Sequence, residues 1–159
     1  FKDAINSRAD IVVLMLGTND GWRKAWGPED LFGAESFKMD YKAMLAVIRA
    51  MKPQPAIYIA IPPPVYRHVR LEYQRLHPQK KPPPTEEEVK IINTIIPGLI
   101  REIHLEAQLP NAVVDVFDAM GGANLSHPEW SADGTHPNNA GYHQIAVAVR
   151  NSLRLDGIV

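Results

Sequence analysis

An uninterrupted apolar stretch that predicts a strand runs from Ile11 to Leu16 and ends abruptly in Gly17-Thr18-Asn19-Asp20. Six consecutive apolar residues, three of them β-branched, predict a strand buried on both faces, as in a parallel α/β sheet. Gly17 suits a sharp turn, because glycine adopts backbone angles that other residues avoid. Polar residues just past a strand's carboxyl end occupy the place where open α/β sheets build their sites. We therefore expect Asn19 and Asp20 at a functional site.

Apolar residues at helical spacing predict three helices that pack on this sheet. They cover residues 35–52, about 85–108, and a final segment that ends near Leu155. In the second helix, Thr85 with Glu88 forms a capping-box pattern, and Pro97 predicts a kink. Asn138 or Asn139 is expected to cap the third.

Two more apolar runs, residues 56–61 and 112–117, predict the second and third strands. Strands that alternate with helices imply a parallel sheet with right-handed crossovers. The chain has 159 residues, enough for one domain with a sizeable core. We expect residues 1–159 to form a single α/β domain.

Proline is the outlier of the composition, with 14 of 159 residues. Two proline clusters frame residues 62–84, which we interpret as a Pro-rich loop insertion, and its middle could form a short basic helix. Long loops in compact domains are usually functional or disordered. Two interpretations stay open. The insertion is either a substrate-facing lid or wall, or a surface excursion whose arginines, such as Arg70 and Arg75, are solvated.

The overall composition excludes several function classes. The net charge of −1 gives no electrostatic footprint for nucleic acid, so no nucleic-acid partner is expected. No apolar run approaches the roughly 20 residues that span a bilayer, so no integral membrane segment is expected. With no cysteine, the chain has no disulfide or thiolate nucleophile, and its compartment stays open.

A second polar motif, Asp133-Gly134-Thr135-His136, lies far downstream, before the final helix. An aspartate and a histidine three residues apart on a loop can meet in space. The carboxylate then orients the imidazole as a general base. The other histidines show no metal-ligand spacing, so no metal site is expected.

Together, these two motifs resemble two of the four signature blocks of the SGNH (GDSL-like) hydrolases. The family's nucleophile-serine block and glycine block have no counterpart here. The resemblance implies a flavodoxin-like three-layer α/β/α sandwich with five parallel strands ordered 2-1-3-4-5. The three strands of this chain would be the third to fifth. Residues 1–159 would then be a single, amino-terminally incomplete SGNH domain whose sheet lacks its first two strands.

The resemblance also implies a role for each motif residue, without a cofactor. His136 would be the general base, and Asp133 would fix its tautomer and stabilise the imidazolium. Asn19 would donate its side-chain amide to the oxyanion of the tetrahedral intermediate. Gly17 and Asp20 would shape the turn that aims Asn19.

The nucleophile is the missing part. The chain contains five serines, at positions 7, 36, 126, 131 and 152, and none follows a strand in a nucleophile-elbow pattern. Ser131 lies on the same loop as the base, in a place that the family does not use for its nucleophile. We therefore expect the nucleophile serine in an upstream segment.

The loop from Gly21 to Gly33 contains Trp22 and Trp26. One interpretation is that these rings pack the loop onto the domain. The other is that one or both line an acyl or sugar pocket beside Asn19, because amphipathic rings suit such clefts.

These observations favour a serine esterase that acts on small or carbohydrate esters. Two alternatives are a catalytically inactive binding module and a fragment that associates with a complementary segment. Without the first two strands, the edge of the Ile11–Leu16 strand would be unpaired, which is an aggregation hazard. We expect an amino-terminal segment or a second copy of the chain to cover this edge.

Overall fold

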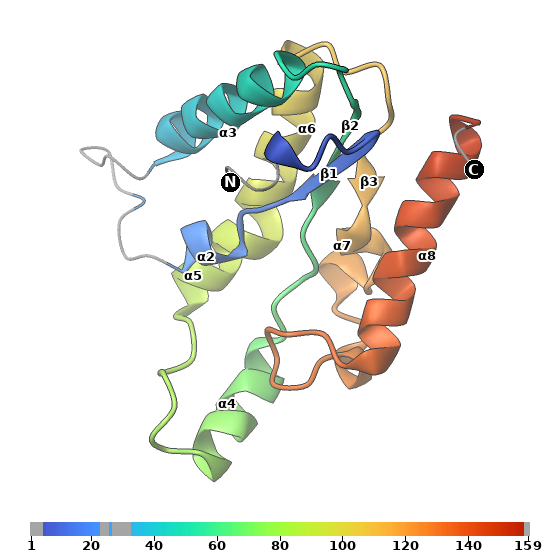
Figure 1. Cartoon of the computed structure of the whole chain (residues 1–159). Helices are drawn as coiled ribbons and strands as arrows, with labels where there is room; N and C mark the ends of the chain where they lie inside the picture. The colour runs from blue at the N-terminus through green and yellow to red at the C-terminus, as the bar shows by residue number, and fades with distance from the viewer. Residues whose placement is uncertain (1–4, 23–25, 27–32, 158–159) are drawn as a thin grey trace.

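The computed structural model describes residues 5–22, 26 and 33–157, and within them three parallel strands form one sheet in the order β1-β2-β3 (Figure 1). The strands are β1 (Ile11–Met15), β2 (Ala56–Ile61) and β3 (Val114–Asp115). Ile11 of β1 pairs with Ala56 of β2, and Ala60 of β2 pairs with Val114 of β3. The predicted mixed α/β fold with a parallel sheet is confirmed, and its strand order is that of the third to fifth strands of the expected sandwich.

Helices cover both faces of the sheet, which gives three layers (Figure 1). On one face, α3 (Ala34–Arg49) and α6 (Ile96–Glu106) pack on Ile57, Ile59 and Ile61 of β2. On the other face, α8 (Asn139–Leu155) packs with Tyr58 and Ala60. Successive side chains of a strand point to opposite faces, so β2 contributes to two separate cores. Because both faces are covered, β2 reads as a continuous apolar run.

The prediction that the first strand is buried on both faces is wrong. Val13 and Met15 of β1 are 36% and 38% exposed, and Leu16 just after it is 41% exposed. Val12 and Leu14, which point to the opposite face, do pack against the core of α3 and α6. The reason is that β1 is an edge strand, and α8 packs on β3 and the neighbouring side of β2 rather than over β1.

The predicted second helix is divided into α5 (Glu86–Lys90), a π-helical turn (Ile91–Ile95) and α6. The capping box is confirmed: the Glu88 N–H donates to the Thr85 hydroxyl, and the Glu88 carboxylate accepts from the Thr85 N–H. Pro97 has no N–H to donate to the turn before it, and that turn is π-helical. Asn138 caps α8 as expected, accepting the N–H of Gly141 at 3.1 Å.

The third strand ends earlier than predicted. Only Val114 and Asp115 are extended, and the chain then enters the short helix α7 (Val116–Ala119). The Asp115 side chain accepts the N–H of Asp118 at 3.0 Å, so it caps this helix. An aspartate that hydrogen-bonds the backbone three residues on favours a helix start over a strand.

Residues 62–84, called here the Pro-rich segment, contain the expected basic helix, α4 (Arg67–Leu76), which lies below the sheet in Figure 1. The start of the segment is fixed to the domain. The Asn93 amide exchanges two hydrogen bonds with the backbone of Val65, at 2.9 and 3.0 Å. The buried Tyr66 hydroxyl donates to the carbonyl of Met120.

Candidate active site

Gly17 determines the direction of the chain after β1. Its φ of +133° lies in a region that other residues rarely adopt, and a Cβ there would lie 2.7 Å from Cγ2 of Ile96. The Gly17 carbonyl accepts the N–H groups of Asp20 and Gly21, which closes the one-turn helix α2 (Thr18–Gly21). This turn holds Asn19 at the carboxyl end of β1, with its side chain exposed.

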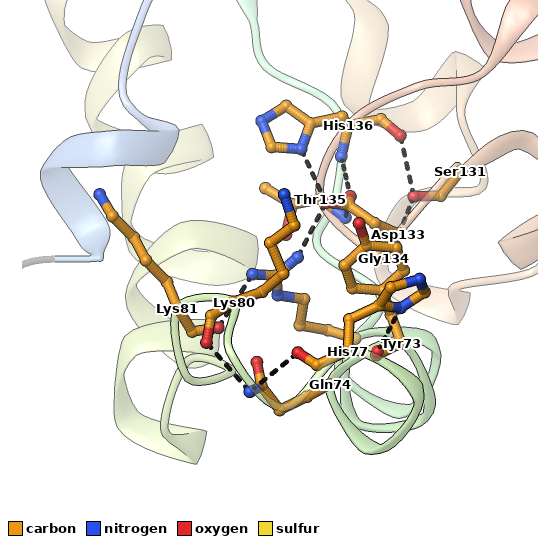
Figure 2. A network of polar contacts seen from close by, with 11 residues as sticks. Tyr73, Gln74, His77, Lys80, Lys81, Ser131, Asp133, Gly134, Thr135 and His136 are labelled. Atoms are coloured by element: carbon orange, nitrogen blue, oxygen red, sulfur yellow. Dashed lines mark hydrogen bonds and ion pairs between the residues drawn. The ribbon is translucent and has the colours of Figure 1, made fainter.

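The loop from Ser131 to Pro137 is closed by an isolated antiparallel bridge between these two residues. The Ser131 hydroxyl lies inside the closed loop (Figure 2), where it donates to the His136 carbonyl at 3.1 Å and accepts the Gly134 N–H at 2.8 Å. Ser131 therefore stabilises the shape of the loop, and its hydroxyl contacts the backbone rather than an imidazole.

Within this loop, Asp133 and His136 are in direct contact (Figure 2). Oδ2 of Asp133 lies 2.9 Å from Nδ1 of His136. The other carboxylate oxygen, Oδ1, accepts the backbone N–H groups of His136 at 2.8 Å and Thr135 at 3.0 Å. The Asp133 side chain is only 13% exposed, whereas that of His136 is 73% exposed. Because Nδ1 faces the carboxylate, Nε2 is the nitrogen that is left for proton transfer.

These contacts also act on the ionisation of Asp133. Burial on its own would raise the pKa of the carboxyl group. The hydrogen bonds from the backbone and imidazole of His136 and from the Thr135 N–H outweigh burial, so the pKa of Asp133 lies below its ordinary value. The carboxylate is therefore charged at neutral pH.

The buried face of this carboxylate contacts a residue that the sequence did not single out. Nη1 of Arg70, on α4, lies 2.8 Å from the same Oδ2 that faces His136. Arg70 is 6% exposed, so the interpretation that the arginines of the Pro-rich segment are simply solvated is wrong for this residue. No sequence signal distinguishes Arg70 from Arg67 or Arg75 on the same basic helix.

A cavity of about 450 Å³ joins the two motifs. Its lining within the described residues comes from three parts of the chain: Asn19, Trp22, Arg70, Lys81, Thr135 and His136. Asn19 and His136 thus line one space, although they come from distant parts of the chain. None of these lining residues is a serine.

The two tryptophans differ in their surroundings. Trp22 lines the cavity, with the Arg70 guanidinium 5.6 Å from its ring centroid. Trp26 instead packs against Phe37, and its indole N–H donates to the Asp20 carbonyl at 3.0 Å. Trp26 therefore packs onto the domain, as the first interpretation expects. Trp22 lines a cavity beside Asn19, and a role in binding an acyl or sugar group stays a prediction. Most of the loop from Gly21 to Gly33 lies outside the described residues.

Neither a metal cluster nor a membrane span is found in the part of the chain that the structure describes. No three histidine or carboxylate side chains there come close enough together to hold an ion. No helix there is both long and apolar enough to cross a bilayer.

A model of the GDSL-like Lipase/Acylhydrolase family matches residues 1–144. The chain belongs to this family. No curated protein sequence matches it.

Three solved structures of GDSL-type and related esterases have the same fold. Their sequence identity to this chain is low, so the similarity concerns the fold and not the substrate. A GDSL-like lipase from Bacteroides thetaiotaomicron is 19% identical, with a TM-score of 0.66 over 98% of this chain. A peptidoglycan O-acetylesterase is 22% identical, with a TM-score of 0.65 over 96%. A catalytic mutant of an acetylxylan esterase from Geobacillus stearothermophilus is 22% identical, with a TM-score of 0.57 over 96%. This chain spans 67%, 39% and 63% of their respective lengths.

Proposed function

We propose that the protein is a serine-type ester hydrolase in which His136 acts as the general base and Asp133 holds its tautomer. The observation that supports this most strongly is the 2.9 Å contact between the two side chains at the wall of a cavity. In the proposed reaction, Nε2 of His136 takes the proton of the nucleophile's hydroxyl and later returns it to the leaving alcohol.

In this proposal, Asn19 stabilises the oxyanion of the tetrahedral intermediate through its side-chain amide. Its position supports the role, because Asn19 and His136 line the same cavity although they are far apart in the sequence. The Gly17 turn would fix the direction of Asn19, with Asp20 completing the turn. A fixed donor of this kind stabilises the transition state, because no reorganisation is needed as charge develops.

We infer that the nucleophile serine lies on a further strand that pairs with the free edge of β1. Two observations support this: Val13, Met15 and Leu16 are exposed beside that edge, and the solved neighbours are longer than this chain. Hydrogen exchange of the β1 amides in the complete protein tests the pairing. Protection of the amides that point away from β2 is expected, and rapid exchange at these positions would contradict it.

The substrate class proposed is a small acyl ester, such as an acetyl group on a carbohydrate. The cavity of about 450 Å³ suits a small ligand, and its polar groups with the Trp22 ring suit a sugar. Two of the solved neighbours are a peptidoglycan O-acetylesterase and an acetylxylan esterase, which is consistent with this choice.

Steady-state hydrolysis of 4-nitrophenyl acetate and of acetylated xylo-oligosaccharides by the complete protein tests the proposal. We expect turnover that His136→Ala lowers by orders of magnitude and that metal chelation leaves unchanged. The absence of a serine from the described lining favours one alternative, a binding module without catalysis. Saturable binding of the acetylated sugar without any hydrolysis would support that alternative and reject the esterase.

A further inference from the structure

Arg70 is one of only two charged side chains among the described residues that are almost completely buried. A buried cation is costly unless it is paired and hydrogen-bonded, so its partners indicate why it is there. Its strongest partner is the Asp133 carboxylate, at 2.8 Å from Nη1. The oxygen involved, Oδ2, is also the one that faces Nδ1 of His136.

The other terminal nitrogen and the faces of the guanidinium contact the Pro-rich segment and the cavity wall, whereas Nε has no hydrogen-bond partner among the described residues. Nη2 donates to the carbonyl of Lys81 at 3.1 Å, near the far end of the segment. The rings of Trp22 and Tyr73 lie 5.6 and 5.3 Å from Cζ, within the range of cation–π attraction. The two terminal nitrogens of Arg70 thus link the Asp133 carboxylate to the Lys81 carbonyl, which a planar fork can do and a lysine ammonium cannot reproduce with the same geometry.

The backbones of α4 and of the Asp133–His136 loop are also in contact. Gly134 has a φ of +84°, and its carbonyl accepts the N–H of Tyr66 at 2.7 Å. A Cβ at Gly134 would lie 2.5 Å from the Arg70 nitrogen and 2.6 Å from the Tyr66 carbonyl oxygen. The first turn of α4 and this loop thus pack without intervening side-chain atoms, which makes the position of Arg70 relative to Asp133 well defined.

We infer that Arg70 is a positioning residue for the Asp133–His136 pair, so the Pro-rich segment belongs to the catalytic apparatus rather than to the surface. This inference rests on the proposed ester hydrolysis. Arg70 would hold Oδ2 towards the imidazole while the loop backbone holds Oδ1.

The test is the steady-state hydrolysis of 4-nitrophenyl acetate by the complete protein and three variants. Arg70→Met should lower kcat by about 10-fold to 100-fold with little change in KM, because a misplaced base impairs chemistry rather than binding. Arg70→Lys should also lower kcat, because the charge stays but the planar fork is lost.

Arg75→Met is the matched control, since Arg75 lies on the same helix, is 68% exposed and pairs with Glu72. It should leave kcat and KM unchanged. Near-ultraviolet circular dichroism shows which variants fold. If Arg70→Met does not fold, the kcat of Arg70→Lys provides the test.

Unchanged kcat in folded Arg70 variants, or a rise in KM alone, would overturn the positioning role. A wild-type protein that hydrolyses no ester would reject the proposed function instead. In that case, the imidazole nitrogen NMR shifts of His136 can be compared between wild type and Arg70→Met. Identical shifts would show that the Arg70–Asp133 contact has no effect on His136, and would overturn the positioning role.

Discussion

Asn19 and His136 lie on two walls of one cavity, although one follows the first strand and the other precedes the last helix. The parallel sheet explains the meeting, because the carboxyl ends of its strands open on the same edge. Asn19 follows β1 directly, and the Asp133–His136 loop approaches from the side of β3 and α7. The proposed base and oxyanion donor therefore flank a space where an ester carbonyl would sit.

The role of His136 predicts a large loss on substitution. His136→Ala in the complete protein should lower kcat for 4-nitrophenyl acetate by about 10³-fold or more, because the base is removed while the cavity stays. His143→Ala is the matched control, since His143 is exposed on α8. Equal activity of the two variants would reject His136 as the base.

Asn19→Ala should lower kcat for the same ester by about 10²-fold to 10³-fold, the usual cost of losing one oxyanion donor. KM should change little, because the donor acts mainly on the transition state. Asn151→Ala, at an exposed position on α8, provides the comparison. An Asn19→Ala enzyme whose kcat matches that of Asn151→Ala would exclude the oxyanion role.

The lowered pKa of Asp133 predicts a pH dependence of stability. A carboxyl group whose folded pKa lies below its unfolded value of about 3.9 stabilises the fold above that pH, and this contribution is lost as acidification protonates it. Asp133→Asn should therefore be less stable than wild type at pH 5–7, and the difference should shrink towards about pH 3.

Urea unfolding between pH 3 and 7 measures this difference, with Asp40→Asn on the exposed side of α3 as the control. A wild-type advantage over Asp133→Asn that stays constant over the whole range would show that the contacts of Asp133 do not depend on its charge.

The close approach at Gly134 predicts an unequal effect of two alanine substitutions. Gly134→Ala should destabilise the protein by about 1–3 kcal/mol, because of its positive φ and the Arg70 and Tyr66 backbone atoms within 2.6 Å of the new Cβ. Gly98→Ala should stabilise by about 0.5–1 kcal/mol, since Gly98 is inside a helix with open space around it. Thermal unfolding measures the stability of both variants relative to wild type. A Gly134→Ala protein as stable as wild type would refute the close packing of α4 on the loop.

Trp22 and Trp26 should respond differently to truncation. Trp22→Ala should raise KM for acetylated oligosaccharides several-fold and leave the unfolding temperature nearly unchanged, because the ring lines the cavity. Trp26→Ala should lower the unfolding temperature, because Trp26 packs on Phe37 and the main core. The reverse pattern would show that the two rings have been assigned the wrong way round.

Sequence patterns predicted the parts of the molecule that depend on local interactions. The caps at Thr85 and Asn138 and the spans of α3 and α8 follow from neighbouring residues alone. The contact between Asp133 and His136 was also predictable, since three residues separate them on one loop. The long apolar runs at Ile11 and Ala56 predicted the first two strands for the same reason.

Features that depend on distant packing were not predictable. The exposed face of Val13 and Met15 depends on where α8 lies, which no pattern in β1 encodes. The burial of Arg70 depends on the approach of α4 to a loop far along the chain, and its neighbours Arg67 and Arg75 carry the same local signal. The early end of β3 was missed for a different, local reason: Asp115 can either continue the strand or cap a helix, and the sequence alone does not decide between the two.

The most direct test of the proposed ester hydrolysis is fluorophosphonate labelling of the complete protein, followed by intact mass and peptide mapping. We expect one adduct on a serine outside residues 1–159, and a much slower reaction in the His136→Ala variant because the base no longer activates that serine. An adduct on Ser131, or a labelling rate that does not depend on His136, would contradict it.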